Sequence, residues 1–386
     1  MLHVLNALFD DRFGGPQKRV IDVGERLRWK GVKTLLLVPK GGGNVIDIAV
    51  MKGLEYVRVP LKRIPKAKEI IMQAAWFLWL PVDVLKVISV IRNREIDLVH
   101  VNGAFFLAPA FAAKLTRRPL VWHLNDTVVP SGIARMLGWL VQQLADEVIV
   151  AADAVAQHYG IKGKSYHVIH APVDVTRIGV KKPLDYRGSQ KCIGFIANWN
   201  PLKGLEVFVQ AAAIVKRFIA DVEFLMAGAR LDSHTEYARE IDELIDRLDL
   251  RENMQCMGFI EDMAEFLHRL DVLILSSWSE ASPMAILEAM AAGVPVVATD
   301  VGGVREILAP SAKEAAGVVV PKGDADGIAR QVIRILKDEK LAMRLGENGR
   351  KRANDLFSLE KCVENHLAVY QKVGCGSRGY SGNTFS

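Results

Sequence analysis

The feature that most constrains the fold is a repeated alternation of short apolar runs and longer helix-forming segments. The runs are mostly apolar throughout, which is typical of parallel strands that are covered on both faces. Helical patterns such as "GLEVFVQAAAIVKRF" and "DGIARQVIRILKD" lie between them and predict βαβ units. The predicted strands are "HVLNAL", "TLLLVP", "EYVRVP", "LVHVN", "LVWHL" and "EVIVAA", then "KCIGFIA", "VEFLMAG", "NMQCMG", "DVLILSS", "PVVATD" and "GVVV".

A polar, turn-rich stretch separates the two series of strands. It reads "VKKPLDYRGSQK" at 180–191, and we interpret it as a linker. A chain of 386 residues is long enough for two domains. We therefore predict two doubly wound α/β domains of parallel strands, at 1–178 and 191–356. Ligands of such sheets bind beyond the carboxyl ends of the strands, which places a cleft between two domains that face each other. The small, polar tail at 375–386 is expected to be disordered.

Basic residues are concentrated in the first half of the chain. Residues 1–178 hold 24 Lys/Arg and 15 Asp/Glu, whereas the remaining residues hold 26 and 29. This bias suits a polyanion, an anionic membrane surface or a phosphorylated ligand, and it does not choose among them. The four cysteines form no C-x-x-C pair, which argues against a zinc site or a disulfide framework and fits a reducing cytosol. We read no signal peptide in "MLHVLNALFDDRFGG" and expect a cytoplasmic protein.

The most membrane-like segment is "IIMQAAWFLWLPVDVLKVISVI" at 70–91. A proline and two charged residues interrupt it, so its clean apolar run is shorter than the ~18 residues that a spanning helix needs. Two interpretations stay open. The segment is either a helix that faces the core or a surface helix that inserts Trp76, Phe77 and Trp79 into a bilayer.

The stretch "SSWSEASPMAILEAMAAGVPVVATDVGG" places two carboxylates, Glu280 and Glu288, among residues that look suited to burial. Ser282 and Pro283 form a helix-start signal, in which a serine caps the helix and proline takes the first helical position. Gly293 ends this predicted helix. Glu280 then lies in the loop before the cap, and Glu288 lies on the second helical turn.

The helix neighbours of Glu288 are small or apolar where a solvent-facing stripe would carry Lys, Glu or Gln. Glu288 is therefore expected to point into protein or ligand. Exposed N–H groups at a helix N-terminus favour anions such as phosphate, and nearby carboxylates accept hydrogen bonds from sugar or ribose hydroxyls. The alternative is that Glu288 is a solvated helix residue and Glu280 is an ordinary loop charge.

The longer stretch "SEASPMAILEAMAAGVPVVATDVGGVREIL" resembles the C-terminal signature of the retaining glycosyltransferases of family 4, the former group 1. The hallmark is a Glu, seven residues, a second Glu and then "AMA-x-G-x-PVVAT", all of which are present. The resemblance implies the GT-B architecture of two Rossmann-like domains. It assigns 1–178 to the acceptor, 191–356 to the nucleotide sugar, and 357–374 to a helix that crosses back to the first domain.

In this resemblance Glu280 lies beside the donor sugar and Glu288 accepts hydrogen bonds from the nucleotide ribose. The backbone of Ser282, Pro283 and Met284 lines the sugar and the diphosphate. The start of the family motif, "EGFP", reads "EASP" here, so the local shape beside the sugar differs from the usual one.

Further motifs resemble the family around the donor phosphate and base. "ANWNPLKG" aligns with "GRL-x-x-x-KG", so Lys203 falls on the lysine that holds the diphosphate, a point-charge partner for phosphate. Asn198 stands in the place of the family arginine, and the sequence does not show which cation replaces it. Gly228 matches a glycine near the nucleotide. In "MGFIEDMAEFL", Phe259 and Ile260 are candidates for reading the base through their backbone.

Two motifs of the first half complete the resemblance. "FGGPQKRVIDVGERLRWKG" matches an early Gly-Gly loop, in which Gly14 and Gly15 let the backbone approach a ligand at a helix N-terminus. "LVWHLNDT" resembles the strand whose histidine contacts the donor sugar, which makes His123 a candidate, although a lone histidine at a strand end is often structural. Asp126 is then expected either to orient the ring or to touch the acceptor.

The implied reaction moves a sugar from a nucleotide-diphosphate sugar to a glycan, lipid-linked or small-molecule acceptor, with Glu280, His123 and Lys203 as the catalytic candidates. The default expectation is bacterial surface polysaccharide or glycolipid synthesis in the cytoplasm or at the inner face of the membrane, without nucleic acid. We predict no cofactor and no essential metal, because "DAD" at 324–326 opens a helix and is better explained as a cap. "PKGGGNV" lacks the third glycine of a dinucleotide-binding loop. A sugar-nucleotide epimerase of the same fold and a non-catalytic scaffold that binds membranes or polyanions stay open as alternatives.

Overall fold

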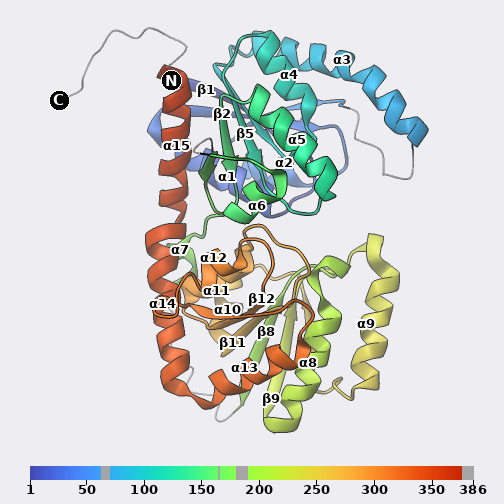
Figure 1. Cartoon of the computed structure of the whole chain (residues 1–386), viewed down its shortest axis with the longest axis vertical. Helices are drawn as coiled ribbons and strands as arrows, with labels where there is room; N and C mark the ends of the chain where they lie inside the picture. Colours follow the sequence, from blue (N-terminus) through green and yellow to red (C-terminus); the bar gives the residue numbers. More distant parts are fainter. Residues whose placement is uncertain (62–69, 164–165, 180–189, 376–386) are drawn as a thin grey trace, which may run out of the picture. The chain divides into compact units, whose positions relative to one another are not determined.

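The computed structural model describes residues 1–61, 70–163, 166–179 and 190–375, and the chain forms two compact units (Figure 1). The first unit comprises Met1–Ala171 and the segment from Leu359 onward, and the second comprises Pro172–Ser358. The sequence placed 172–178 in the first domain, whereas these residues belong to the second unit. The reason is that the short helix α7 (Val175–Ile178) packs against helices of the second unit. Most of the predicted linker and tail lies outside the described residues.

The first unit is built on a seven-stranded parallel sheet in the order β3-β2-β1-β4-β5-β6-β7. Its central strands are buried along their whole length, as the continuous apolar runs predict. The sequence missed β7, which has only three half-buried residues and pairs with β6. The strands are β1 (Leu2–Ala7), β2 (Val32–Pro39), β3 (Glu55–Val59), β4 (Leu98–Asn102), β5 (Leu120–Leu124), β6 (Glu147–Val150) and β7 (Tyr166–Val168).

Helices cover this sheet, and the last helix of the chain is one of them. Val363 and Tyr370 of that helix, α15, pack in one buried cluster with Val23 and Leu27 of α1. The described helical elements are α1 (Gly15–Leu27), η1 (Arg28–Lys30), α2 (Val45–Met51), α3 (Ile70–Asn93), α4 (Leu107–Leu115), α5 (Ser131–Leu144), α6 (Asp153–Tyr159) and α15 (Leu359–Cys375).

The second unit has a six-stranded parallel sheet in the order β10-β9-β8-β11-β12-β13. Each of these strands was predicted, and most of them are short apolar runs between helical segments. The strands are β8 (Lys191–Ile196), β9 (Val222–Ala227), β10 (Met254–Gly258), β11 (Val272–Leu275), β12 (Val296–Thr299) and β13 (Gly317–Val320). The two Rossmann-like sheets confirm the predicted fold class.

The helices of the second unit pack in pairs on its sheet, α8 with α13 and α11 with α14. Asp324 caps α13 by accepting a hydrogen bond from the Gly327 N–H at 2.7 Å, which confirms the capping interpretation of "DAD". Besides α7, the helical elements are η2 (Pro201–Lys203), α8 (Leu205–Phe218), η3 (Asp232–His234), α9 (Thr235–Arg247), α10 (Met263–Arg269), α11 (Met284–Ala292), α12 (Val304–Leu308), α13 (Ala325–Lys337) and α14 (Glu339–Phe357).

Candidate functional site

The second unit has a topological switch point between β8 and β11. From β8 the chain continues to β9 and β10 on one side, whereas β12 and β13 extend from β11 on the other. Ligands of doubly wound sheets bind at such a point, outside the carboxyl ends of the strands. The predicted donor residues follow those ends: Asn198 and Lys203 after β8, Gly228 after β9, Phe259 and Ile260 after β10, and Glu280, Ser282, Pro283, Met284 and Glu288 after β11.

Lys203 and Glu280 form the central contact at this switch point. Nζ of Lys203 lies 2.7 Å from Oε1 of Glu280, and the Ser277 hydroxyl donates to the same oxygen at 2.7 Å. The Glu280 side chain is 10% exposed and the Lys203 side chain is 32% exposed. The Glu280 side chain is therefore mostly enclosed, whereas the Lys203 side chain is partly exposed. The sequence did not predict the role of Ser277, whose only signal is the pair of serines that follows the apolar strand.

Backbone contacts fix the loop that carries Lys203. Gly204 has a φ of 62°, in the left-handed region that favours glycine, and a Cβ there would lie 2.2 Å from the Ser276 carbonyl oxygen. The Ser276 hydroxyl donates to the Gly204 carbonyl at 2.7 Å, and the Trp278 N–H donates to the Leu202 carbonyl at 2.8 Å. These bonds hold the loops after β8 and β11 together, which places Lys203 opposite Glu280.

The loop after β12 supports Glu280 from another side. Gly302 has a φ of 51°, and a Cβ at this position would lie 1.6 Å from the carbonyl oxygen of Glu280. The Thr299 hydroxyl donates to the Ser277 carbonyl at 2.6 Å. The "ATDVGG" part of the motif therefore has a structural purpose, since only a glycine allows the two loops to come this close.

Helix α11 begins one residue later than predicted. Pro283 occupies the cap position with an extended backbone, and Met284 is the first helical residue. The prediction that Ser282 caps the helix is therefore wrong, because the buried Pro283 already provides the non-helical backbone that a cap requires. Gly293 ends the helix in the left-handed conformation, as predicted. Glu288 lies on the second turn and is half-buried, so it is not a fully solvated helix residue.

Asn198 and Gly228 join the loops after β8 and β9. Oδ1 of Asn198 accepts a hydrogen bond from the Ala229 N–H at 2.9 Å. Gly228 has a φ of 136°, and a Cβ there would lie 1.9 Å from the Ala197 carbonyl oxygen. Close backbone packing thus requires the glycine. The Asn198 side chain links the two loops by a hydrogen bond, at the position where the family has an arginine.

Arg230, the basic residue that follows Ala229 in the sequence, already has a partner. The guanidinium of Arg230 lies 4.2 Å above the Trp199 ring and donates to both oxygens of Asp242, at 2.5 and 2.8 Å. Arg230 therefore does not replace the family arginine as an uncompensated charge. Beyond β10, Phe259 is 76% exposed and Ile260 is half-buried.

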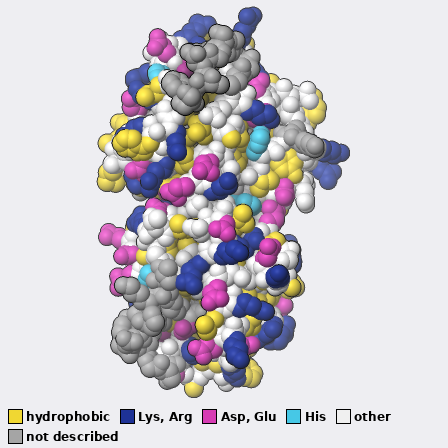
Figure 2. Space-filling view, turned by 90° about the vertical axis from the view of Figure 1, so that its left-hand side faces the viewer, with side chains coloured by type: hydrophobic (Ala, Val, Ile, Leu, Met, Phe, Trp, Pro, Cys, Tyr) yellow, Lys and Arg dark blue, Asp and Glu magenta, His cyan; other side chains and the backbone are white. Residues whose placement is uncertain are grey.

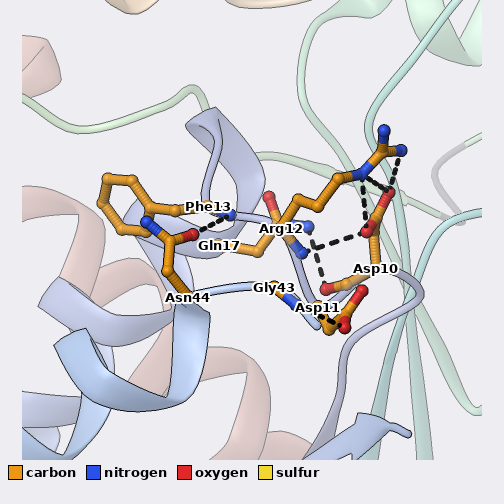
Figure 3. A network of polar contacts seen from close by, with 7 residues as sticks. All are labelled: Asp10, Asp11, Arg12, Phe13, Gln17, Gly43 and Asn44. Atoms are coloured by element: carbon orange, nitrogen blue, oxygen red, sulfur yellow. Dashed lines mark hydrogen bonds and ion pairs between the residues drawn. The ribbon is translucent and has the colours of Figure 1, made fainter. Parts of the chain in front are cut away.

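In the first unit, the Gly-Gly loop opens α1 as predicted, with Gly14 at the cap and Gly15 as the first helical residue. The chain just before it is tied to the loop at 40–44 (Figure 3). The carboxylate of Asp11 is buried and accepts a hydrogen bond from the Gly43 N–H at 2.8 Å. A Cβ at Gly43 would lie 2.0 Å from the Asp11 carbonyl oxygen. The glycines of "PKGGGNV" therefore allow close packing around Asp11.

His123 has no exposed surface in this structure, and its contact with the donor sugar stays a prediction. Its Nε2 lies 2.6 Å from Nη1 of Arg19, a buried residue that also donates to Oδ1 of Asn125 at 2.7 Å and to Oδ1 of Asn102. Burial lowers the pKa of the Arg19 guanidinium to about 10. The sequence missed Arg19, although its position on the buried face of an amphipathic helix was a usable signal.

Asp126 lies near this cluster but does not orient the histidine, because Arg19 makes the contact with the His123 ring. Instead, Oδ1 of Asp126 accepts a hydrogen bond from the Tyr159 hydroxyl at 3.1 Å. Burial, and then this carboxylate, raises the pKa of Tyr159 above its ordinary value. A contact between Asp126 and an acceptor stays a prediction.

Three buried histidines of the first unit, His100, His123 and His366, form the group with metal-ligand potential found among the described residues. Their ring centroids lie 5.6–5.8 Å apart. A guanidinium can only donate hydrogen bonds, so Nε2 of His123 accepts from Arg19 and the neutral ring carries its proton on Nδ1. Neither nitrogen of His123 is then available to a metal, and the adjacent positive charge opposes a second cation. We therefore interpret the cluster as structural.

Comparisons with known proteins identify the family. The model of Glycosyltransferase Family 4 matches residues 13–177, and the model of Glycosyl transferases group 1 matches residues 180–352. N-acetyl-alpha-D-glucosaminyl L-malate synthase of Bacillus anthracis is 31% identical over 309 residues, which are 75% of this chain and 78% of that protein. The chain belongs to the group 1 glycosyltransferases. This confirms the resemblance inferred from the motif that contains Glu280 and Glu288.

Two further proteins place this glycosyltransferase among its relatives. Phosphatidyl-myo-inositol mannosyltransferase of Mycolicibacterium smegmatis is 27% identical over 342 residues, which are 85% of this chain and 82% of the relative. The crystal structure of Anabaena Alr3699/HepE in complex with UDP and glucose superposes with a TM-score of 0.79 and 20% identity. That match covers 96% of this chain and 100% of the other, and it shows the shared GT-B fold.

Proposed function

We propose that this glycosyltransferase moves a sugar from a nucleoside diphosphate sugar to a glycan, lipid-linked or small-molecule acceptor and retains the anomeric configuration. The observation that carries the proposal is the Lys203–Glu280 pair at the switch point of the second unit. The UDP complex of HepE supports a UDP-linked donor over the GDP-linked alternative. The mannosyltransferase relative supports a role in bacterial glycolipid or polysaccharide synthesis. We keep the predicted cytoplasmic location, which rests on cysteine usage.

The donor diphosphate is proposed to bind between Lys203 and the N-terminus of α11. Binding replaces the carboxylate partner of the Lys203 ammonium with phosphate oxygens, while the Ser277 hydroxyl keeps Glu280 in place. The released carboxylate oxygen then accepts hydrogen bonds from hydroxyls of the donor sugar. The first amides of α11 favour the same anion through the helix dipole. Glu288, on the next turn, is proposed to accept hydrogen bonds from the ribose.

In the proposed reaction, the bond between the anomeric carbon and the diphosphate oxygen breaks as the acceptor oxygen bonds to that carbon on the same face. The acceptor proton passes to the leaving phosphate oxygen, so the step needs no nucleophile from the protein. The negative charge that develops on the diphosphate is stabilised by Lys203 and by the amides of α11. Glu280 positions the sugar and forms no covalent intermediate.

The test measures release of nucleoside diphosphate from UDP- and GDP-sugars with and without candidate acceptors. A thermal-shift screen of the same nucleotide sugars first selects the donor. We expect release that depends on the acceptor, and a product with the donor's anomeric configuration by NMR. Conversion of the sugar without acceptor would instead support an epimerase. The absence of any thermal shift with every nucleotide sugar would support a non-catalytic scaffold.

A further inference from the structure

Arg19 is the one Lys or Arg that is buried among the described residues, with 3% of its surface exposed. On the face shown in Figure 2, by contrast, basic side chains lie at the surface of each unit, among acidic ones. In the membrane-like segment at 70–91, the side chain of Lys86 is 33% exposed, and the side chains of Trp76 and Phe77 lie outside those described. No helix of the described residues combines the length and the apolarity needed to cross a bilayer. Arg19 is therefore the buried cation that needs an explanation.

Arg19 reaches a layer of polar side chains on the face of the first sheet that α1 and α15 cover. Side chains of a strand alternate between the two faces, so residues two or four positions apart share a face. Towards the amino ends of the strands, this face carries Val4, Leu98 and Val121, which pack with α1 and α15 in one apolar cluster. Towards the carboxyl ends the same face becomes polar. Each member of this polar layer is 5% exposed or less, and we define the layer as Asn6, Arg19, His100, Asn102 and His123.

The guanidinium of Arg19 has only neutral partners among the described residues. Its Nη1 donates to Nε2 of His123 at 2.6 Å and to Oδ1 of Asn125 at 2.7 Å, and its Nη2 donates to Oδ1 of Asn102. Burial lowers the pKa of this guanidinium to about 10, so the group stays protonated near neutral pH. A buried charge without a counter-charge is costly, and such departures from the usual rules of burial are expected at functional sites.

The contacts of the polar layer fix both partners of the guanidinium. Nδ2 of Asn102 donates to Oδ1 of Asn6 at 2.6 Å, so Oδ1 of Asn102 is the atom that faces Arg19. The ring of His123 is held from a second side by His100, since the two rings stack with centroids 5.6 Å apart and an angle of 12° between their planes. Arg19 presents its donors in one rigid plane, and it therefore sets the position of the His123 ring relative to Asn102.

The same contact decides which nitrogen of His123 carries the proton. Nε2 accepts from the guanidinium, so the neutral ring is protonated on Nδ1, whereas free histidine in water prefers the proton on Nε2. Nδ1 is buried and has no hydrogen-bond partner among the described residues. A buried donor without a partner needs an explanation, and a ligand that supplies the missing acceptor is one. Asn125 and Asp126, just after β5, are half-buried, so a ligand at the carboxyl edge of the sheet approaches the ring from there.

We propose that Arg19 is a positioning residue for sugar transfer, which fixes His123 so that Nδ1–H is the hydrogen bond that the ring offers to an oxygen of the donor sugar. Arg19 itself does not touch the substrate. The inference rests on the proposed function, because the ligand it requires is a nucleotide sugar. An arginine with a structural role alone would link α1 to β4 and β5, and its loss would change stability without changing the tautomer of His123.

The first test reads the tautomer of His123 directly, by nitrogen NMR of protein labelled in its histidine rings. The signals of His123 are those that disappear in His123→Asn. In the wild type we expect a neutral ring with its proton on Nδ1. Arg19→Met removes the donor and should move the proton to Nε2, whereas Arg19→Lys keeps a charged donor and should preserve the wild-type tautomer. This measurement needs neither a nucleotide sugar nor an acceptor.

The second test measures sugar transfer by the same variants. Arg19→Met should lower kcat/KM for the nucleotide sugar by about tenfold or more, because the hydrogen bond from His123 to the sugar is lost. The affinity for UDP, which carries no sugar, should stay within about twofold of that of the wild type. Arg19→Lys should recover most of the loss in kcat/KM. Arg26→Met is the matched control, since Arg26 is exposed on the same helix, and it should transfer sugar as the wild type does.

A double-mutant cycle separates positioning from a structural role. If Arg19 acts through His123, Arg19→Met should cost little more in the His123→Asn background. Additive losses in this cycle would overturn the proposal, and so would a wild-type His123 with its proton on Nε2 or a tautomer that Arg19→Met leaves unchanged.

The failure of the proposed function gives a different result. A wild type that transfers no sugar from any nucleotide sugar contradicts that function, whereas the NMR measurement still decides whether Arg19 fixes His123. Circular dichroism of each variant shows whether a loss of transfer is a loss of fold. If Arg19→Met does not fold, the tautomer of the wild type and the activity of Arg19→Lys still test the proposal.

Discussion

The histidine cluster predicts that the first unit loses stability when the pH falls from about 7.5 to about 5.5, across the ordinary pKa of histidine. Burial and the neighbouring Arg19 guanidinium lower the pKa of His100 and His123 well below its ordinary value and that of His366 to about 3. The unfolded chain therefore takes up protons in this range, whereas the folded unit does not. Stability is then present above the unfolded pKa and is lost as the pH falls below it.

The magnitude follows from the burial of the three rings, which are 0–2% exposed. If the pKa of a histidine is about 6.5 in the unfolded chain and the residue stays neutral in the fold, it reduces the free energy of unfolding by about 1.4 kcal/mol at a pH of about 5.5. Three such residues together reduce the free energy of unfolding by about 4 kcal/mol. A loss of this size is a large fraction of the ~5–15 kcal/mol that stabilises a typical domain.

Hydrogen exchange measures this loss for each unit separately. The slowest amides of β4 and β5 report on opening of the first unit, and those of β8 and β11 serve as an internal reference. We expect the free energy of opening of β4 and β5 to fall towards acid pH with a slope that approaches three protons. In the His366→Met variant this slope should fall towards two protons. This slope can be read even if the variant is less stable overall. A flat profile, or an unchanged slope in the variant, would refute the reasoning.

Three further predictions concern the second unit. Gly302→Ala should destabilise it by about 3 kcal/mol or more, measured by urea unfolding, because a Cβ would collide with the Glu280 carbonyl in a left-handed backbone; wild-type stability would contradict the close packing. Glu288→Ala should weaken nucleotide binding, measured by calorimetry, by about tenfold or more. Glu243→Ala is the control, because Glu243 is an exposed carboxylate on α9, and this variant should bind as the wild type does. Equal affinities of the two variants would show that Glu288 is not part of the site. Treatment with a chelator should leave the rate of sugar transfer unchanged, and a loss that added metal restores would show that a metal is required.

Much of the fold was predictable because burial on both faces leaves a direct mark in the sequence. β11 is a run of four apolar residues, and a parallel strand covered on both faces tolerates this composition better than other short elements do. β7 left no such mark, since its three residues are only half-buried at the edge of the sheet. The start of α11 was missed by one residue because serine and proline are both common before a helix.

The candidate site, like the fold, was predictable only where the signal is local in the sequence. Lys203 and Glu280 belong to local motifs, and the structure brings them together because Gly204 and Gly302 allow their loops to pack closely. The burial of His123 could not be predicted from its motif, because it depends on α15, which follows it by more than two hundred residues and brings His366 beside it. A motif records which residue ends a strand, but it does not record what covers that residue.

The central claim is that the second unit binds the donor diphosphate through Lys203 at the switch point between β8 and β11. The most direct measurement is calorimetric titration of UDP into the wild type, Lys203→Ala and a control variant, Lys216→Ala. In the wild type, Lys216 lies in the last turn of α8 and pairs with Asp249. Loss of a hydrogen bond to a charged group costs about 1.5–3 kcal/mol, so Lys203→Ala should lower the affinity by about ten- to a hundredfold. The control should bind UDP as the wild type does. Equal affinity of Lys203→Ala and the wild type would contradict the claim.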